Sequence, residues 1–284
     1  MSEKSIVKDT SDAIKGIAEA VPIYQDAISP AAKELGKALT TVAKSVHIAL
    51  LPVSALVWGY EQIKEYISIK LAEKLKNTPD QDIITPKTNI AGPTLEALRF
   101  TGHEDSLREM YANLLATSMD VITATLAYPS FVEIIKQMTS DEAKLMKLFS
   151  IKKAFPLISI RMVVANNDSG AGGVDILRNF SFLGDEAGCE NRKLVDAYLD
   201  NLCRLGLIDI PSNFQYTKIG IYKSLENHPV IKKCINKIEV HPNKKHIIER
   251  KGIRVTKLGE HFIKACVIDH EKIRNEINSS SQYK

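Results

Sequence analysis

The sequence lacks the features that mark several large classes of protein. It has only 4 cysteines, with no C-x-x-C spacing, and modest numbers of proline (11) and glycine (14). The first 30 residues show no basic stretch followed by an apolar core. The modest glycine and proline content argues against disorder in the bulk of the chain, and the cysteine spacing and the missing leader pattern predict a reducing, cytoplasmic compartment. With 284 residues, 44% of them hydrophobic, the chain is long enough for two globular domains.

The sequence also lacks a convincing set of catalytic or metal-binding residues. His103 and Glu104 resemble the start of a zinc-protease motif, but Leu107 stands where that motif needs its second histidine. His241 and His246 have no cysteine or carboxylate pattern around them that would complete a metal site. We therefore predict that the protein is not an enzyme and needs no metal or cofactor.

Apolar residues recur at helical spacing through the first half of the sequence. Four of them, each four positions after the last, predict the buried face of one helix: Ile63, Ile67, Leu71 and Leu75. Thr139 and Glu142 form a capping box that predicts another helix start. The expected helices lie near residues 11–20, 29–52, 63–75, 94–100, 104–119 and 130–137, with a loop over 77–93.

The second half mixes strand and helix signals. Residues 157–164 are rich in β-prone side chains and precede a polar, glycine-containing loop, and 192–205 predicts an amphipathic helix. Two short β-prone runs, 246–248 and 253–255, flank residues 249–252, which we interpret as a hairpin turn. Thr256 is expected to cap a final helix that continues through Ile273. Two helices, a hairpin and a closing helix resemble a winged-helix domain.

These patterns predict an α+β fold that is mostly α, with a helical N-terminal domain and a winged-helix-like α/β C-terminal domain. The expected parts are a flexible start (1–10), the helical domain (11–150), the winged-helix-like domain (151–274) and a flexible tail (275–284). Residues 1–150 hold 16 Lys and Arg against 19 Asp and Glu, whereas residues 151–284 hold 22 against 15. The C-terminal domain is therefore the basic one, which favours an acidic partner.

A cluster of basic residues in the C-terminal domain is the candidate partner-binding site. Nine Lys and Arg lie between residues 232 and 257, against only two glutamates. The expected helix over 192–205 carries Asp196 and Asp200, which would repel a phosphate backbone, so we favour a protein partner over nucleic acid. The residues assigned to partner binding are Lys232, Lys233, Lys244, Lys245, Arg250, Lys251 and Arg254.

One apolar stretch is suited to a membrane. Residues 45–60 include no Asp, Glu, Lys or Arg, but as a helix they would span only about 24 Å, less than a hydrocarbon core of about 30 Å. Two interpretations are compatible: a buried core helix at rest, and a segment that inserts when several copies assemble. The residues assigned to the membrane-active segment are Lys44, Leu50, Leu51, Pro52, Val53, Leu56, Val57, Trp58 and Tyr60.

An ordered series of short motifs resembles the Abi-alpha, or abortive infection alpha, family. The motifs include AVPIYQD (20–26), PAAKELGK (30–37) and VWGYEQI (57–63). Further motifs are IAGP (90–93), LRFTGHE (98–104), MYANLLA (110–116) and PSFVEIIKQ (129–137). Together they cover about half of the chain, from residue 20 to residue 148.

The resemblance implies a bacterial antiphage protein that arrests or kills the infected cell, and it supplies no catalytic residues. Our leading hypothesis is a cytoplasmic effector that recognises a phage protein, such as a ring-shaped structural protein, then forms a homo-oligomer and permeabilises the inner membrane through a pore. One alternative is a winged-helix protein that binds nucleic acid. Another is a soluble inhibitor of phage replication or assembly.

Overall fold

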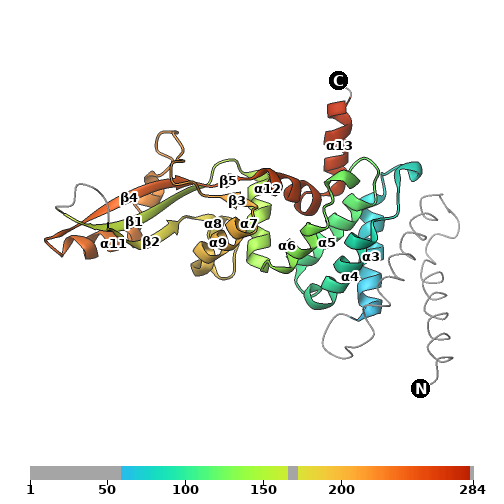
Figure 1. The fold of residues 1–284 in the computed structure, drawn as a ribbon, viewed down its shortest axis with the longest axis horizontal. Helices are drawn as coiled ribbons and strands as arrows, with labels where there is room; N and C mark the ends of the chain where they lie inside the picture. Colours follow the sequence, from blue (N-terminus) through green and yellow to red (C-terminus); the bar gives the residue numbers. More distant parts are fainter. Residues whose placement is uncertain (1–58, 166–171, 282–284) are drawn as a thin grey trace, which may run out of the picture. The chain divides into compact units, whose positions relative to one another are not determined.

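The computed structural model describes residues 59–165 and 172–281 of the chain (Figure 1). The expected flexible start, the helices expected over 11–20 and 29–52, and the apolar segment up to Trp58 lie outside these residues. The chain divides into two compact units. Unit 1 comprises Met1–Gln137 and Lys264–Lys284, and unit 2 comprises Met138–Ile263.

The described part of unit 1 is built from helices around a central one, α5 (Asp105–Ser118). All residues from 110 to 120 are buried, so this helix from Met110 onward and the turn after it are covered on every side. The helices that pack against it are α3 (Tyr60–Leu75), α4 (Thr88–Thr101), α6 (Ser130–Lys136) and α13 (His270–Ser281). Two short 3-10 turns, η2 (Asp80–Asp82) and η3 (Ala124–Leu126), complete the unit.

Helix α3 confirms the apolar stripe that the sequence predicts. Its four apolar residues, spaced four apart, are at most 3% exposed: Ile63, Ile67, Leu71 and Leu75. Burying each such side chain stabilises the fold by roughly 1.5–3 kcal/mol relative to leaving it in water. The predicted helices over 104–119 and 130–137 are likewise confirmed as α5 and α6.

Helix α4 begins earlier than the sequence predicts. The expected loop ends at Pro93, but α4 starts at Thr88 and contains this proline. Proline removes one helical hydrogen bond, which is why a proline ordinarily indicates a boundary. Here Ile90 and Ala91 are 1% and 2% exposed, and their burial stabilises a turn that the local sequence does not favour.

Unit 2 combines short helices with two small antiparallel sheets. Its helices are α7 (Ser140–Ile151), α8 (Leu183–Glu186), η4 (Arg192–Leu194), α9 (Val195–Arg204), α10 (Lys223–Glu226), α11 (Pro229–Glu239) and α12 (Lys257–Phe262). Its strands are β1 (Pro156–Val164), β2 (Val174–Phe180), β3 (Ile208–Asp209), β4 (Lys244–Gly252) and β5 (Arg254–Val255). The fold is therefore α+β and mostly helical, as predicted, while the winged-helix likeness stays a prediction.

The larger sheet has the order β2-β1-β4, and the smaller one pairs β3 with β5. The hairpin turn expected at residues 249–252 is wrong, because these residues are the end of β4. This strand pairs continuously with β1, from Lys244 opposite Val164 to Gly252 opposite Pro156. Long-range pairing with β1 thus holds the charged run Glu249–Gly252 extended, although the local sequence is typical of a turn.

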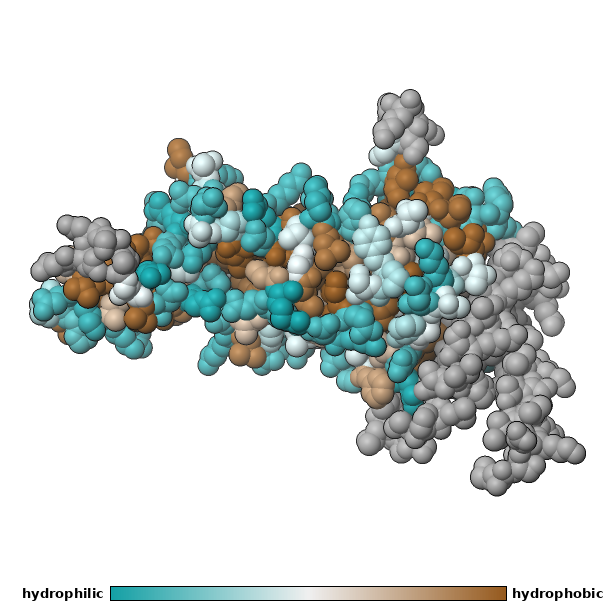
Figure 2. Space-filling model, in the orientation of Figure 1, coloured by the Kyte–Doolittle hydropathy of each residue, from teal (hydrophilic) through white to brown (hydrophobic). Residues whose placement is uncertain are grey.

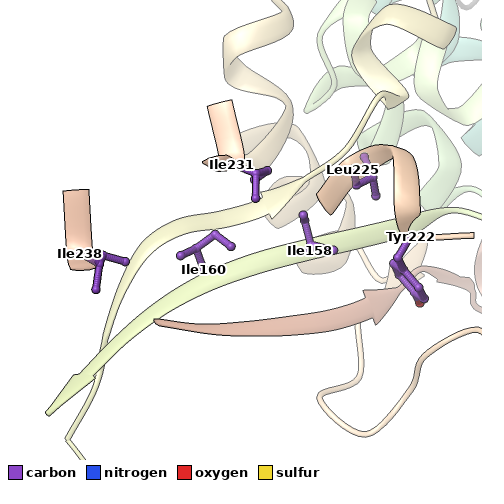
Figure 3. Packing of buried hydrophobic residues seen from close by; sticks show 6 residues of the cluster. All are labelled: Ile158, Ile160, Tyr222, Leu225, Ile231 and Ile238. Atoms are coloured by element: carbon purple, nitrogen blue, oxygen red, sulfur yellow. The ribbon is translucent and has the colours of Figure 1, made fainter. Parts of the chain in front are cut away.

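One hydrophobic cluster of unit 2 lies between the larger sheet and the helices α10 and α11 (Figure 3). Alternate residues of β1 point to one face of the sheet, as the pleat requires. Six buried residues form the cluster: Ile158 and Ile160 from β1, Tyr222 and Leu225 at α10, and Ile231 and Ile238 from α11. This packing fixes α11 against the sheet and determines which face of the helix is left to solvent.

Helix caps confirm two predicted starts and correct one predicted length. The Thr139 side chain accepts a hydrogen bond from the Glu142 backbone, and Thr256 accepts one from Gly259. The single final helix expected through Ile273 is instead three segments, because α12 ends at Phe262, a π-helix covers Ile263–Val267, and α13 begins at His270.

The unit boundaries differ from the expected domains. The expected division after Ser150 falls within α7, which packs against α8 and α9 and so belongs to unit 2. At the other end, residues 264–274 belong to unit 1, and the tail expected from 275 is helical as far as Ser281. Contacts with segments distant in sequence decide both assignments.

Gly259 offers a test of the packing at the start of α12. A Cβ at this position would lie 2.0 Å from the Leu207 carbonyl oxygen and 2.9 Å from Val255 Cγ1. We expect Gly259→Ala to lower the free energy of unfolding by about 1–3 kcal/mol through overpacking, measured by urea titration and circular dichroism. Gly59→Ala is the control, since nothing lies within 4 Å of its Cβ. Equal stability of the two variants would contradict this packing.

Candidate functional site

Helix α11 and strand β4 place a group of lysines on the surface of unit 2. The His228 side chain caps α11 at Val230, and the Glu239 carboxylate at the helix end lies 3.0 Å from His246 Nδ1 on β4. Since the isoleucine stripe of α11 faces the sheet, its lysines face solvent. Two further lysines, Lys244 and Lys245, stand at the start of β4, where the pleat directs neighbouring side chains to opposite faces of the sheet. We call this whole group of lysines the basic surface, comprising Lys232, Lys233, Lys237, Lys244 and Lys245.

The lysines of the basic surface have no salt bridge with any carboxylate in residues 59–165 and 172–281. All five are exposed. Glu239, the nearest acidic residue in the sequence, pairs with His246 instead. Exposed cations without salt-bridge partners leave a positive field at the surface, which steers and orients an acidic partner.

The other three residues assigned to partner binding are held in ion pairs. Arg250 Nε lies 2.6 Å from Glu226, Lys251 lies 3.0 Å from Glu249, and Arg254 lies 2.7 Å from Asp209. The hydrogen bond that Arg250 donates to Glu226 also raises the pKa of Arg250 above its ordinary value. The structure thus divides the predicted cluster into unpaired lysines and residues whose charge is balanced locally.

Apolar side chains border the basic surface. Val164 at the end of β1, Val174 at the start of β2 and Val240 after α11 are 53%, 59% and 77% exposed. Hydrophilic and hydrophobic residues accordingly alternate over the end of the sheet in Figure 2. The surface therefore offers a partner both charge and a small apolar contact area.

The residues assigned to the membrane-active segment lie outside the described residues, except Tyr60, which is the first residue of α3. Across residues 59–165 and 172–281, no helix has the length and apolar character needed to cross a membrane.

A second site, which the sequence did not reveal, is a buried polar cluster in unit 1. Asp120 and His270 are both 0% exposed, and their side chains meet at 2.9 Å. Arg274 lies 2.6 Å from Asp120 through Nη1 and also pairs with Asp82. The His270 ring also contacts the Lys74 carbonyl oxygen at 3.3 Å. These contacts attach α13 to segments 150 or more positions earlier in the sequence.

A half-buried group of charges continues the cluster toward the surface. Lys74 Nζ contacts Glu109 Oε1 at 2.5 Å and Asp269 at 3.4 Å, and Tyr66 donates a hydrogen bond to Glu109 at 3.3 Å. Burial raises the pKa of Tyr66, and the Glu109 charge adds to that shift. These contacts join α3, which carries Tyr66 and Lys74, to Glu109 on α5 and to Asp269 just before α13.

Two cysteines of unit 2, Cys189 and Cys203, show no sign of nucleophilic activation. Burial raises the pKa of the Cys189 and Cys203 thiols to about 11. A thiol with such a pKa is protonated at neutral pH and is a poor nucleophile. No group of three His, Cys, Asp or Glu suited to a metal occurs within the part of the chain that the structure describes.

The buried cluster predicts a loss of stability in acid. Burial tends to raise the pKa of Asp120, but hydrogen bonds from His270 and Arg274 outweigh it and hold the pKa below its ordinary value. The unfolded state therefore binds the proton more readily, and the stability from Asp120 is present above about pH 4 and lost as pH falls further. We expect the stability difference between the wild type and Asp120→Asn to shrink from pH 7 to pH 3 in urea titrations. A difference independent of pH would contradict this.

The comparisons with known proteins agree with the motifs in the sequence. The family model described as abortive infection alpha matches residues 59–266. One solved structure, an uncharacterized protein from the hydrocarbon-degrading marine bacterium Alcanivorax borkumensis SK2, is 24% identical, with a TM-score of 0.33. That match covers 49% of this chain and 90% of the other. No curated protein matches.

The family model matches a different part of the chain from the one that the motifs cover. The match begins at Gly59, after the first two motifs, and continues to Cys266, well beyond residue 148. Both described units therefore carry the family pattern, the basic surface included. Residues 59–266 are 208 of 284 positions, nearly three quarters of the sequence. The chain belongs to the abortive infection alpha family, whose proteins act in the defence of bacteria against phages.

Proposed function

We propose that this protein is a non-enzymatic effector of abortive infection whose basic surface recognises an acidic region of a phage protein. The observation that carries the proposal is the set of five exposed lysines without carboxylate partners in the described residues. By contrast, Arg250, Lys251 and Arg254 are neutralised locally. Unpaired lysines raise the rate of encounter with an acidic surface and are available for new ion pairs.

The protein is proposed to rest in the cytoplasm and to act at the inner membrane once triggered. The support is the run 45–60, which has no Asp, Glu, Lys or Arg. A single helix of this length is too short to line an aqueous channel, so a pore needs several copies of the chain. Several copies could direct Lys44, His47 and Ser54 toward a shared water-filled interior and present apolar residues to lipid. A multivalent, ring-shaped phage protein would raise the effective concentration of the bound copies.

A single charge in the apolar segment tests the membrane step. Leu50→Lys is expected to abolish protection against phage, because a charge at the centre of a membrane helix costs roughly 2.5–3.5 kcal/mol. The variant must remain soluble and monodisperse by size-exclusion chromatography, so that misfolding is excluded. Such a variant that still protects cells would show that the membrane step is wrong.

Nucleic acid is the alternative ligand for the basic surface. Helix α9 argues against it, because Asp196 is exposed and Asp200, although paired with Arg178 at 3.2 Å, is half exposed. Carboxylates on this helix would repel a phosphate backbone. Tight duplex binding at physiological salt, with a steep salt dependence that disappears when Lys244 and Lys245 are neutralised, would favour the nucleic-acid function instead.

A further inference from the structure

Strand β4 is an edge strand with one side unpaired in the described part of the chain. It pairs with β1 along all nine of its residues, and the sheet order β2-β1-β4 places no described strand beyond it. An open strand of this length presents a row of backbone donors and acceptors to solvent.

The hydrogen bonds at the two ends of β4 identify which residues face outward. The Ala165 N–H donates to the Asn243 carbonyl at 2.9 Å, and the Ile253 N–H donates to Phe155 at 3.2 Å. The register between β1 and β4 has no shift, so hydrogen-bonded and non-hydrogen-bonded residue pairs alternate along the two strands. Odd-numbered residues of β4 therefore bond β1, and the backbone groups of His246, Ile248 and Arg250 point to the open edge.

The charges of β4 determine what can pair with this edge. Two copies of β4 paired antiparallel about Ile248 would place Lys245 opposite Lys251. Like charges in directly opposed positions destabilise a sheet, so a second copy of this chain is disfavoured. An acidic strand would instead meet Lys245 and, next to it, the exposed aliphatic side chain of Ile247, which is 37% exposed.

We propose that the open edge of β4 binds an extended, acidic segment of the partner protein as an additional strand. This inference rests on the proposed function, and it specifies how the partner of the basic surface is bound. Backbone hydrogen bonds to His246 and Ile248 hold the segment. The lysines at the start of β4 and on α11 supply its preference for acidic residues.

A synthetic strand tests the inference without knowledge of the natural partner. The probe is a capped, fluorescent peptide of alternating glutamate and threonine, compared by anisotropy with the same peptide N-methylated at every residue. The methylated peptide keeps its charges but has no backbone donors. We expect it to bind the full-length protein about tenfold more weakly. We also expect the unmethylated peptide to slow hydrogen exchange at the His246 and Ile248 amides.

A proline on the edge provides the matched variant. Because the His246 N–H points outward, His246→Pro removes a donor to the partner and none to β1. His246→Ala removes the same side chain but keeps the donor, so only the proline variant should bind the peptide about tenfold more weakly. Strand addition would be overturned if the wild-type protein bound the methylated and unmethylated peptides equally well, or if it bound neither peptide. A different experiment tests the proposed function: it would be wrong if cells that express the variant with a charge-reversed basic surface remain protected against phage.

Discussion

Reversing four charges of the basic surface is expected to abolish protection against phage while leaving the protein folded. The variant replaces Lys232, Lys233, Lys244 and Lys245 with glutamate. All four side chains are exposed, and none has a salt bridge within the described residues, so the folded state loses little. Like charges facing each other across an interface cost several kcal/mol, which corresponds to at least about a hundredfold in affinity. The measurement is the efficiency of phage plating on cells that express the variant.

The matched control reverses four other exposed lysines of unit 2, namely Lys147, Lys153, Lys193 and Lys218. It changes the residue type and the net charge by the same amount, but at positions outside α11 and β4. Cells with the control should restrict phage as the wild type does. If both variants lose protection equally, the net charge of the chain matters and the basic surface is not the recognition site.

Removing the guanidinium of Arg274 from the buried cluster of unit 1 is expected to cause the largest loss of stability of any single substitution considered. Arg274→Met retains the aliphatic stem but leaves the carboxylate of Asp120, which is 0% exposed, without its guanidinium partner. Breaking a buried ion pair in this way costs about 3–5 kcal/mol. Lys264→Met is the control, because its pair with Glu276 is well exposed and contributes about 1 kcal/mol or less.

A double variant separates the ion pair from a general packing defect. In Arg274→Met combined with Asp120→Asn, the uncompensated charge is gone, so the loss should be several tenths to about 3 kcal/mol smaller than the sum of the single losses. Chemical unfolding followed by circular dichroism measures all four proteins. Additive losses would mean that the two side chains contribute independently, and the buried cluster would then not act as a unit.

Local patterns in the sequence predict much of unit 1 and the individual helix starts. The apolar stripe of α3 and the caps at Thr139 and Thr256 depend on residues within one or two turns, so spacing alone reveals them. The α+β class follows similarly, from the change of periodicity after Ser150. The sequence also locates the basic cluster, because counting Lys and Arg along the chain is enough to find it.

Long-range contacts determine the features that the sequence could not predict. The run Glu249–Gly252 is typical of a turn, and only its pairing with β1 makes it strand. Asp120, His270 and Arg274 are distant in sequence, so nothing local indicates that they meet in a buried cluster. The pairing of Arg250 with Glu226 is likewise invisible in the sequence, yet it separates balanced charges from unpaired ones.

The most direct test of the account is the membrane potential of infected cells, followed with a voltage-sensitive dye from phage addition to lysis. We predict that cells with the wild-type protein depolarise after infection and before any lysis. Cells with Leu50→Lys, or with the four charge-reversed lysines of the basic surface, should keep their potential until the phage lyses them. Wild-type cells that stop phage production with an undiminished membrane potential would contradict the account.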